Sequence, residues 1–169
     1  LRECSRRLRA AKDQPLVEAL APALDSYWER EIKEQVAAEL RAQTFDPRQA
    51  FKEGLAAYQA SASDRSQAAK LFAPAAAHGH AGAQYYLAMI YERGAGVPRD
   101  IAAALNLYRQ SATNGYSEAG VVLGNYYTDG VEVKQDHAEA FVWYSVATAQ
   151  GHRVAEVFRN SARRKLTAQ

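Results

Sequence analysis

The sequence matches itself once after a shift of 36 residues, and this repeat constrains the fold more than any other feature. Residues 83–116 align with residues 119–152 without a gap. A fixed period of this length indicates a solenoid, in which each unit buries its apolar face only against its neighbours. The abundance of alanine favours helices over strands. We therefore predict an all-α fold, an α/α superhelix of about three helical hairpins. The identical pairs are Ala83/Ala119, Leu87/Leu123, Tyr91/Tyr127, Gly94/Gly130, Val97/Val133, Asp100/Asp136, Ala102/Ala138, Ala104/Ala140, Tyr108/Tyr144 and Gly115/Gly151.

Each repeated unit contains the signals of a helix, a turn and a second helix. In the middle unit, Ala83, Leu87 and Tyr91 recur at helical spacing and form one apolar stripe. Gly94 follows, where a left-handed residue ends the first helix, and Asp100 is placed to cap the second. The same residue types recur at the equivalent positions of the last unit. Every repeated residue thus has a structural use.

A first, shortened hairpin is predicted before these two units. Asp46-Pro47 marks a helix start, with the aspartate as N-cap and the proline at the first helical position. Asp64 stands in the place of Asp100, so we expect it to cap the second helix of this hairpin. The predicted hairpins cover residues 46–79, 80–115 and 116–152.

Two flanking segments complete the predicted organisation. Residues 153–169 have a helical pattern and predict a C-terminal capping helix. Residues 1–45 predict a basic lead-in and then an amphipathic helix over 23–43. Two interpretations of that helix stay open: it covers an end of the solenoid, or it makes a homodimer. Its apolar stripe recurs every four residues from Leu20 through Leu24, Trp28, Ile32 and Val36 to Leu40.

Composition and charge argue against several function classes. A net charge of +2 gives no strong attraction to nucleic acid, and the basic clusters near both ends are typical of solvated helix faces. No apolar run approaches the ~20 residues that span a bilayer, and no signal peptide is expected within the sequence. We therefore predict neither a nucleic-acid partner nor direct membrane insertion. The single cysteine, Cys4, excludes an internal disulfide.

No set of residues has the spacing of a catalytic, metal or cofactor site. His78 and His80 flank a glycine that ends a helix, and no carboxylate lies at ligand spacing from them. His137 has no serine or cysteine nucleophile signature near it. The glycine-containing turns lack the lysine and the preceding strand of a nucleotide-binding loop. We therefore expect no catalytic residue, no metal and no cofactor.

The positions that change between the repeats are the candidates for function. In the first helices of the last two hairpins, these side chains project away from the apolar stripe, toward the concave side of a superhelix. Aromatic and methionine side chains there suit a peptide-binding groove. The alternative stays open that some of them pack against the terminal helices instead. The candidate partner-binding residues are Tyr85, Met89, Glu92, Val121, Asn125 and Thr128.

The repeated residues resemble the Sel1-like repeat family, a relative of the tetratricopeptide repeat. The resemblance covers residues 47–152. One departure is Glu132, which stands where the family's second loop glycine is expected and resists the positive φ of that position. In the last unit the family motif is matched by Ala119, Leu123, Gly124, Tyr127, Gly130, Val133, Asp136, Ala140, Trp143, Tyr144, Ala147 and Gly151.

The resemblance implies an adaptor that holds a protein partner, as in signalling, envelope or secretion-related assemblies, and it favours a bacterial envelope protein. The leading hypothesis is therefore a non-enzymatic scaffold that binds a partner peptide or helix in the concave groove. Two alternatives stay open: an assembly module that dimerises within a larger envelope protein, and a binder of, or enzyme on, cell-wall fragments.

Overall fold

The computed structural model describes residues 30–31, 34, 45–61 and 63–167. The chain divides into two compact units, Leu1–Phe45 and Asp46–Gln169. In the first unit, the described residues Arg30, Glu31 and Glu34 are helical. The rest of the predicted lead-in and of the amphipathic 23–43 helix lies outside the described residues, so its capping or dimerising role stays a prediction.

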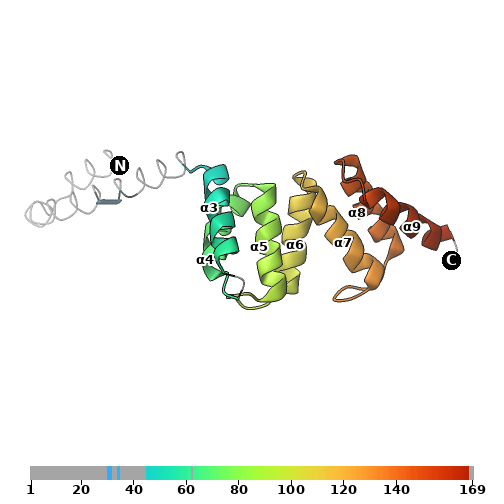
Figure 1. The fold of residues 1–169 in the computed structure, drawn as a ribbon, viewed down its shortest axis with the longest axis horizontal. Coiled ribbons are helices and arrows are strands. Elements are labelled where there is room, and N and C mark those ends of the chain that lie inside the picture. The colour runs from blue at the N-terminus through green and yellow to red at the C-terminus, as the bar shows by residue number, and fades with distance from the viewer. Residues whose placement is uncertain (1–29, 32–33, 35–44, 62, 168–169) are drawn as a thin grey trace, which may run out of the picture. The chain divides into compact units, whose positions relative to one another are not determined.

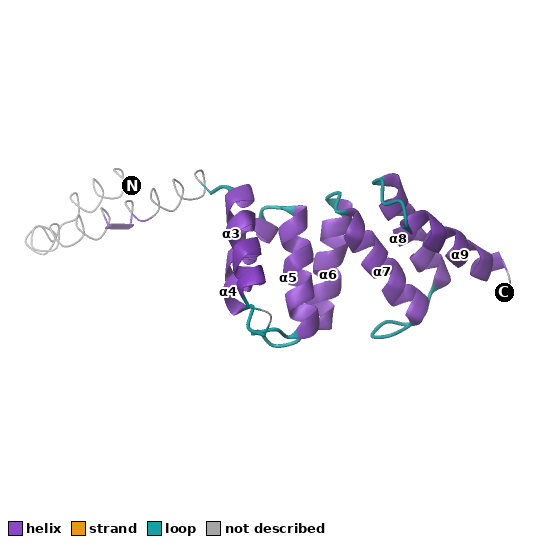
Figure 2. Cartoon of the chain, viewed as in Figure 1, coloured by secondary structure: helices purple, strands orange, loops and turns teal. Residues whose placement is uncertain are grey.

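The second unit is a row of helices without strands over its described residues (Figures 1 and 2). Consecutive helices pack against each other, so that α3 and α4, α5 and α6, and α7 and α8 form three successive hairpins. The all-α prediction is confirmed. The helices are α3 (Pro47–Ala60), α4 (Ser66–Ala77), α5 (Ala81–Arg93), α6 (Ile101–Thr113), α7 (Ser117–Asp129), α8 (His137–Ala149) and α9 (Ala155–Thr167).

The core of the row repeats one arrangement on the second helix of each hairpin. Phe72, Tyr108 and Tyr144 are spaced 36 residues apart, and each is at most 3% exposed. A buried alanine lies one turn before each of them. Small residues let helices approach closely, and the aromatic ring then fills the space between them. This alternation explains how a chain so rich in alanine builds a core.

Helix ends follow the predicted signals, with one correction. Asp46, Asp100 and Asp136 are N-caps whose carboxylates accept backbone N–H groups of the next turn. Asp64 was predicted to be the equivalent cap of α4, but Arg65 takes that position. The turn before α4 is shorter, and the Arg65 N–H donates to the Ala95 carbonyl 3.2 Å away in the next turn. Asp64 still accepts from the Ser66 N–H at 2.9 Å.

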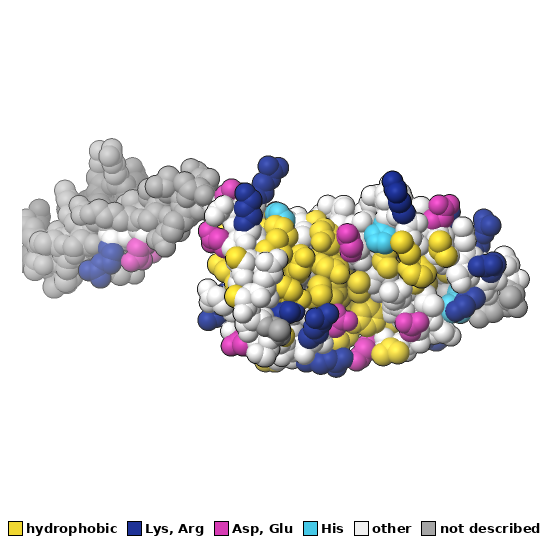
Figure 3. Space-filling view, in the orientation of Figure 1, with side chains coloured by type: hydrophobic (Ala, Val, Ile, Leu, Met, Phe, Trp, Pro, Cys, Tyr) yellow, Lys and Arg dark blue, Asp and Glu magenta, His cyan; other side chains and the backbone are white. Residues whose placement is uncertain are grey.

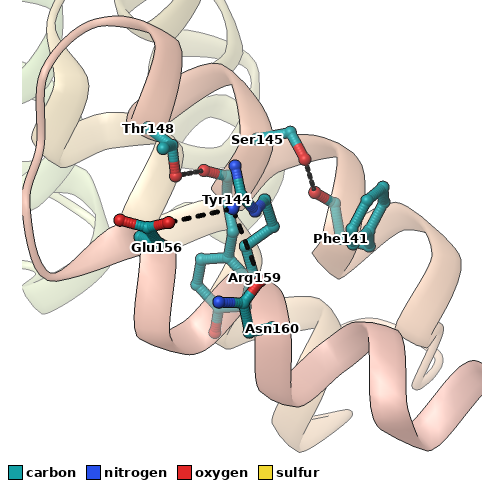
Figure 4. A network of polar contacts seen from close by, with 7 residues as sticks. All are labelled: Phe141, Tyr144, Ser145, Thr148, Glu156, Arg159 and Asn160. Atoms are coloured by element: carbon teal, nitrogen blue, oxygen red, sulfur yellow. Dashed lines mark hydrogen bonds and ion pairs between the residues drawn. The ribbon is translucent and has the colours of Figure 1, made fainter.

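Helix α9 packs on α8 at the C-terminal end of the row. Ala155 and Ala162 are buried there, and the Phe158 ring lies 5.5 Å from the ring of Tyr144. Figure 4 shows the polar contacts around this pair of helices, including the Arg159 guanidinium, which reaches Glu156 and Asn160 of its own helix. The role of residues 153–169 as a cap stays a prediction. No helix in the part of the chain that the structure describes is long and apolar enough to cross a membrane.

Candidate functional site

A groove with a volume of about 670 Å³ lies between α5 and α7, bordered by the turns that follow these helices. In Figure 3, hydrophobic side chains gather over the middle helices, with acidic and basic side chains beside them. The groove itself is lined by apolar and aromatic side chains together with acidic and basic ones. Its lining comprises Tyr85, Met89, Glu92 and Arg93 of α5, Arg99 and Tyr108, Val122, Asn125, Tyr126 and Asp129 of α7, and Val131 and Glu132.

Four of the six predicted partner-binding residues line this groove together. They are Tyr85, Met89, Glu92 and Asn125. They come from both walls, since the first three lie on α5 and Asn125 lies on α7. Asn125 is exposed, whereas the other three are half-buried. The structure thus brings these four side chains around one hollow.

The other two predicted residues contact α8 instead. Val121 packs against the buried cluster of Ala140, Tyr144 and Ala162, which joins α8 to α9. The Thr128 hydroxyl lies 3.2 Å from the hydroxyl of Tyr144. Val121 is therefore a side chain that packs near a terminal helix, which was the alternative interpretation of these positions.

The Glu92 carboxylate is held by two tyrosine hydroxyls from two other helices. Tyr108 of α6 donates to Oε2 at 2.6 Å, and Tyr126 of α7 donates to Oε1 at 2.5 Å. Burial, followed by the hydrogen bond to Glu92, raises the pKa of both tyrosines well above 10. Both hydroxyls therefore stay protonated and act as fixed donors at neutral pH. This network positions Glu92 at the groove.

Aromatic rings form the wall at the other end of α5. The Tyr85 ring lies 4.8 Å from the ring of Tyr116 and 5.7 Å from that of Tyr108. Burial raises the pKa of Tyr116 to about 12, and it is also the largest cause of a raised pKa at Tyr85. Tilted contacts between neighbouring rings are favourable, so Tyr85 lines the groove as part of a packed aromatic cluster.

An ion pair between successive turns borders the groove near the Glu92 end. The Arg99 guanidinium bonds the Glu132 carboxylate and also donates through Nε to the Glu92 carbonyl at 3.1 Å. The hydrogen bond to Glu132 raises the pKa of Arg99. Glu132 reaches this partner from a left-handed backbone with φ of 65°. Glu132 therefore adopts the positive φ that a glutamate is expected to resist.

Sequence reasoning missed several lining residues, notably Tyr126, Arg99 and Glu132. Each joins its partner across a long separation: 33 residues from Arg99 to Glu132 and 34 from Glu92 to Tyr126. These separations are close to the repeat period of 36 residues, because successive units stack in register. A search for complementary side chains near that spacing would have found them.

The groove offers chemical groups that can bind another molecule by non-covalent contacts. It offers a fixed carboxylate, an exposed amide, a flexible thioether and aromatic walls, which are features of protein-binding surfaces. Of the histidines considered as ligands, His80 accepts the Ala83 N–H at 3.2 Å as a helix cap, and His78 Nδ1 lies 2.8 Å from the Pro74 carbonyl. Over the described ranges, no group of three or more histidine, cysteine or acidic side chains could hold a metal ion.

Comparison with known proteins identifies the repeats. A family model described as Sel1 repeat matches residues 53–80, 81–116 and 119–152. The second and third matches coincide closely with the hairpins α5/α6 and α7/α8, whereas the first begins within α3. No curated protein matches the sequence significantly.

Two solved structures show the same fold. A Sel1 repeat protein from Oxalobacter formigenes is similar with a TM-score of 0.59 and 25% identity, over 65% of this chain and 45% of that protein. A protective antigen of uropathogenic Escherichia coli strains, which displays an SLR fold, has a TM-score of 0.65 and 28% identity, over 73% of this chain and 27% of that protein. The chain thus spans less than half the length of either protein.

Proposed function

This chain belongs to the Sel1 repeat family, and we propose that it is a non-enzymatic scaffold that binds a peptide or helix of a partner protein in the groove between α5 and α7. Sel1 repeat proteins generally mediate protein–protein interaction, and their fold is typically a non-catalytic scaffold. The observation that carries the proposal is the shared groove location of Tyr85, Met89, Glu92 and Asn125, which are variable rather than repeated positions.

The dimensions and chemistry of the groove support a peptide occupant. A volume near 670 Å³ lies within the roughly 300–1,000 Å³ of ordinary ligand sites and accommodates a few side chains. Met89 and Val122 supply apolar contact, and the methionine can adapt its shape to a guest. The exposed Asn125 amide can bond a peptide backbone or side chain. Burying a few anchoring side chains is enough to dominate the affinity of such a complex.

Selection from a peptide library tests the proposal. A library of random 12-residue peptides displayed on phage is panned against the full chain, and the dissociation constants of enriched peptides are measured by fluorescence anisotropy. We expect Asn125→Arg to weaken them at least tenfold, because a long cation then projects into the groove. Asn106→Arg is the matched control, since Asn106 is an exposed asparagine of α6 outside the groove lining. It should leave binding within twofold of wild type.

A second groove variant, Met89→Ala, removes apolar contact without adding charge and should weaken the same peptides several-fold. Melting temperatures of all variants are measured alongside, so that loss of binding is separated from loss of folding. The proposal is wrong if no peptide is enriched, or if the enriched peptides bind both groove variants as tightly as they bind wild type.

A further inference from the structure

The groove has an excess of negative charge near Glu92. Its lining holds three carboxylates, Glu92, Asp129 and Glu132, and two guanidinium groups, Arg93 and Arg99. Arg99 and Glu132 pair with each other, and each neutralises the other. Two carboxylates and one cation then remain. Within the described part of the chain, no ion pair forms at Glu92.

The Glu92 carboxylate is oriented before any ligand arrives. Each of its oxygens accepts one tyrosine hydroxyl, from Tyr108 and from Tyr126, and the Tyr108 side chain is only 1% exposed. A carboxylate oxygen can accept a second hydrogen bond, so both oxygens keep acceptor capacity toward the groove. Because the carboxylate is already held, a guest does not bear the entropic cost of ordering it.

The surroundings of Glu92 match a long cationic side chain. Met89 lies one turn before Glu92 on α5, and Val122 lines the opposite wall. Lysine and arginine side chains lay their methylene stems along apolar surface and place the charge at its end. Tyr85 and Tyr126 line the same groove, and aromatic rings attract cations.

We propose that the groove takes a lysine or arginine side chain of the partner peptide, with its cation paired to Glu92 and its stem against Met89 and Val122. The inference rests on the proposed function and specifies the chemistry of the guest. The equivalent position of the next unit is Thr128, which carries no charge and bonds Tyr144. The carboxylate of this site is therefore not repeated in the last hairpin.

The test uses the peptides selected by panning against the full chain. We expect peptides whose binding Asn125→Arg abolishes to share a lysine or arginine at one position. Replacing that residue by methionine, which keeps most of the stem, should raise the dissociation constant about tenfold. Glu92→Gln should weaken the basic peptide to a similar extent. The two changes together should then cost little more than either alone, which identifies a direct pair.

Glu139→Gln is the matched control, because it makes the same substitution at an exposed glutamate of α8 outside the groove lining. It should weaken binding less than threefold. If Glu92→Gln does not fold, the methionine-substituted peptide against the wild-type chain decides the question. Groove-dependent peptides without a basic position, or with unchanged affinity after its replacement, would overturn this inference and leave the scaffold proposal standing. The absence of any groove-dependent peptide would overturn both.

Discussion

The hairpins α5/α6 and α7/α8 place a tyrosine at the same position and give it different partners. In the first, Tyr108 donates to the Glu92 carboxylate at 2.6 Å. In the second, Tyr144 donates to the Asn125 amide oxygen at 2.7 Å and lies 3.2 Å from the Thr128 hydroxyl. The same scaffold position thus orients a charged group in one unit and a neutral pair in the next. The repeated residues maintain the packing of the hairpins, and the variable residues determine which groups the repeated tyrosine binds.

The two hairpins also differ in how closely their helices approach. Gly124 of α7 faces the Tyr144 ring so tightly that an added Cβ would lie 2.3 Å from a ring carbon. The equivalent residue of α5 is Ala88, which is fully buried and fits without conflict. A glycine is therefore required in one hairpin and not in the other, although both have the same fold.

The largest expected effect is that of Gly124→Ala. The new methyl group must displace the buried Tyr144 ring, so we expect the free energy of unfolding to fall by about 3 kcal/mol. The reverse change in the other hairpin, Ala88→Gly, removes only a methyl group and some helix propensity, and should cost about 1 kcal/mol. Urea unfolding followed by circular dichroism measures both. Equal losses would show that the two helix contacts are equally tight.

The next largest effect is a difference in stability loss between removing the Tyr108 hydroxyl and removing the Tyr144 hydroxyl. Tyr108→Phe removes a buried hydrogen bond to a charged group, for which we expect a loss of about 2 kcal/mol. Tyr144→Phe removes bonds to neutral groups that water can reach, and about 1 kcal/mol is expected. The same urea titrations report the difference. A larger loss for Tyr144→Phe would contradict the view that the carboxylate makes the stronger network.

Alkaline pH should destabilise the middle hairpin. Burial and the bond to Glu92 raise the pKa of Tyr108 above the unfolded value near 10. Above pH 10 the unfolded chain loses this proton while the folded chain keeps it, so stability is complete below pH 10 and falls as pH rises. Tyr108 alone contributes a fall of up to about 1.4 kcal/mol per pH unit. Urea titrations at pH 8, 10 and 11 should show a shallower fall in Tyr108→Phe, and an unchanged fall would refute the assignment.

The smallest effect concerns the turns. Glu132→Gly relieves the strain of a left-handed φ of 65° but breaks the ion pair with Arg99. The Arg99 side chain is 54% exposed and that of Glu132 is 35% exposed. Since these contributions oppose each other, we expect a change within about 0.5 kcal/mol of zero. Glu132→Ala keeps the strained backbone and loses the pair, so it should be less stable than the glycine variant. Chemical denaturation compares them; a glycine variant as unstable as the alanine variant would show that backbone strain is unimportant here.

The sequence alone was sufficient for the helices and their order. Helix ends depend on local backbone preferences, so Gly94 and Gly130 at positive φ and the caps Asp100 and Asp136 were readable from residue type and spacing. The repeat period sets Tyr108 and Tyr144 at equivalent positions, and both are buried, because positions one period apart occupy equivalent places in the packing of a solenoid. Asp64 was the exception, since a shorter turn moved the cap to Arg65.

Only the tertiary structure decided which variable residues share the groove. The tyrosine–carboxylate network joins Tyr108, Glu92 and Tyr126 from three helices, which local spacing does not bring together. Val121 projects from its helix at the position equivalent to Tyr85, yet it packs against the cluster that includes Ala162 of α9. Helical periodicity gives the direction of a side chain, whereas the packing of neighbouring helices determines whether that direction leads to a groove or to a core.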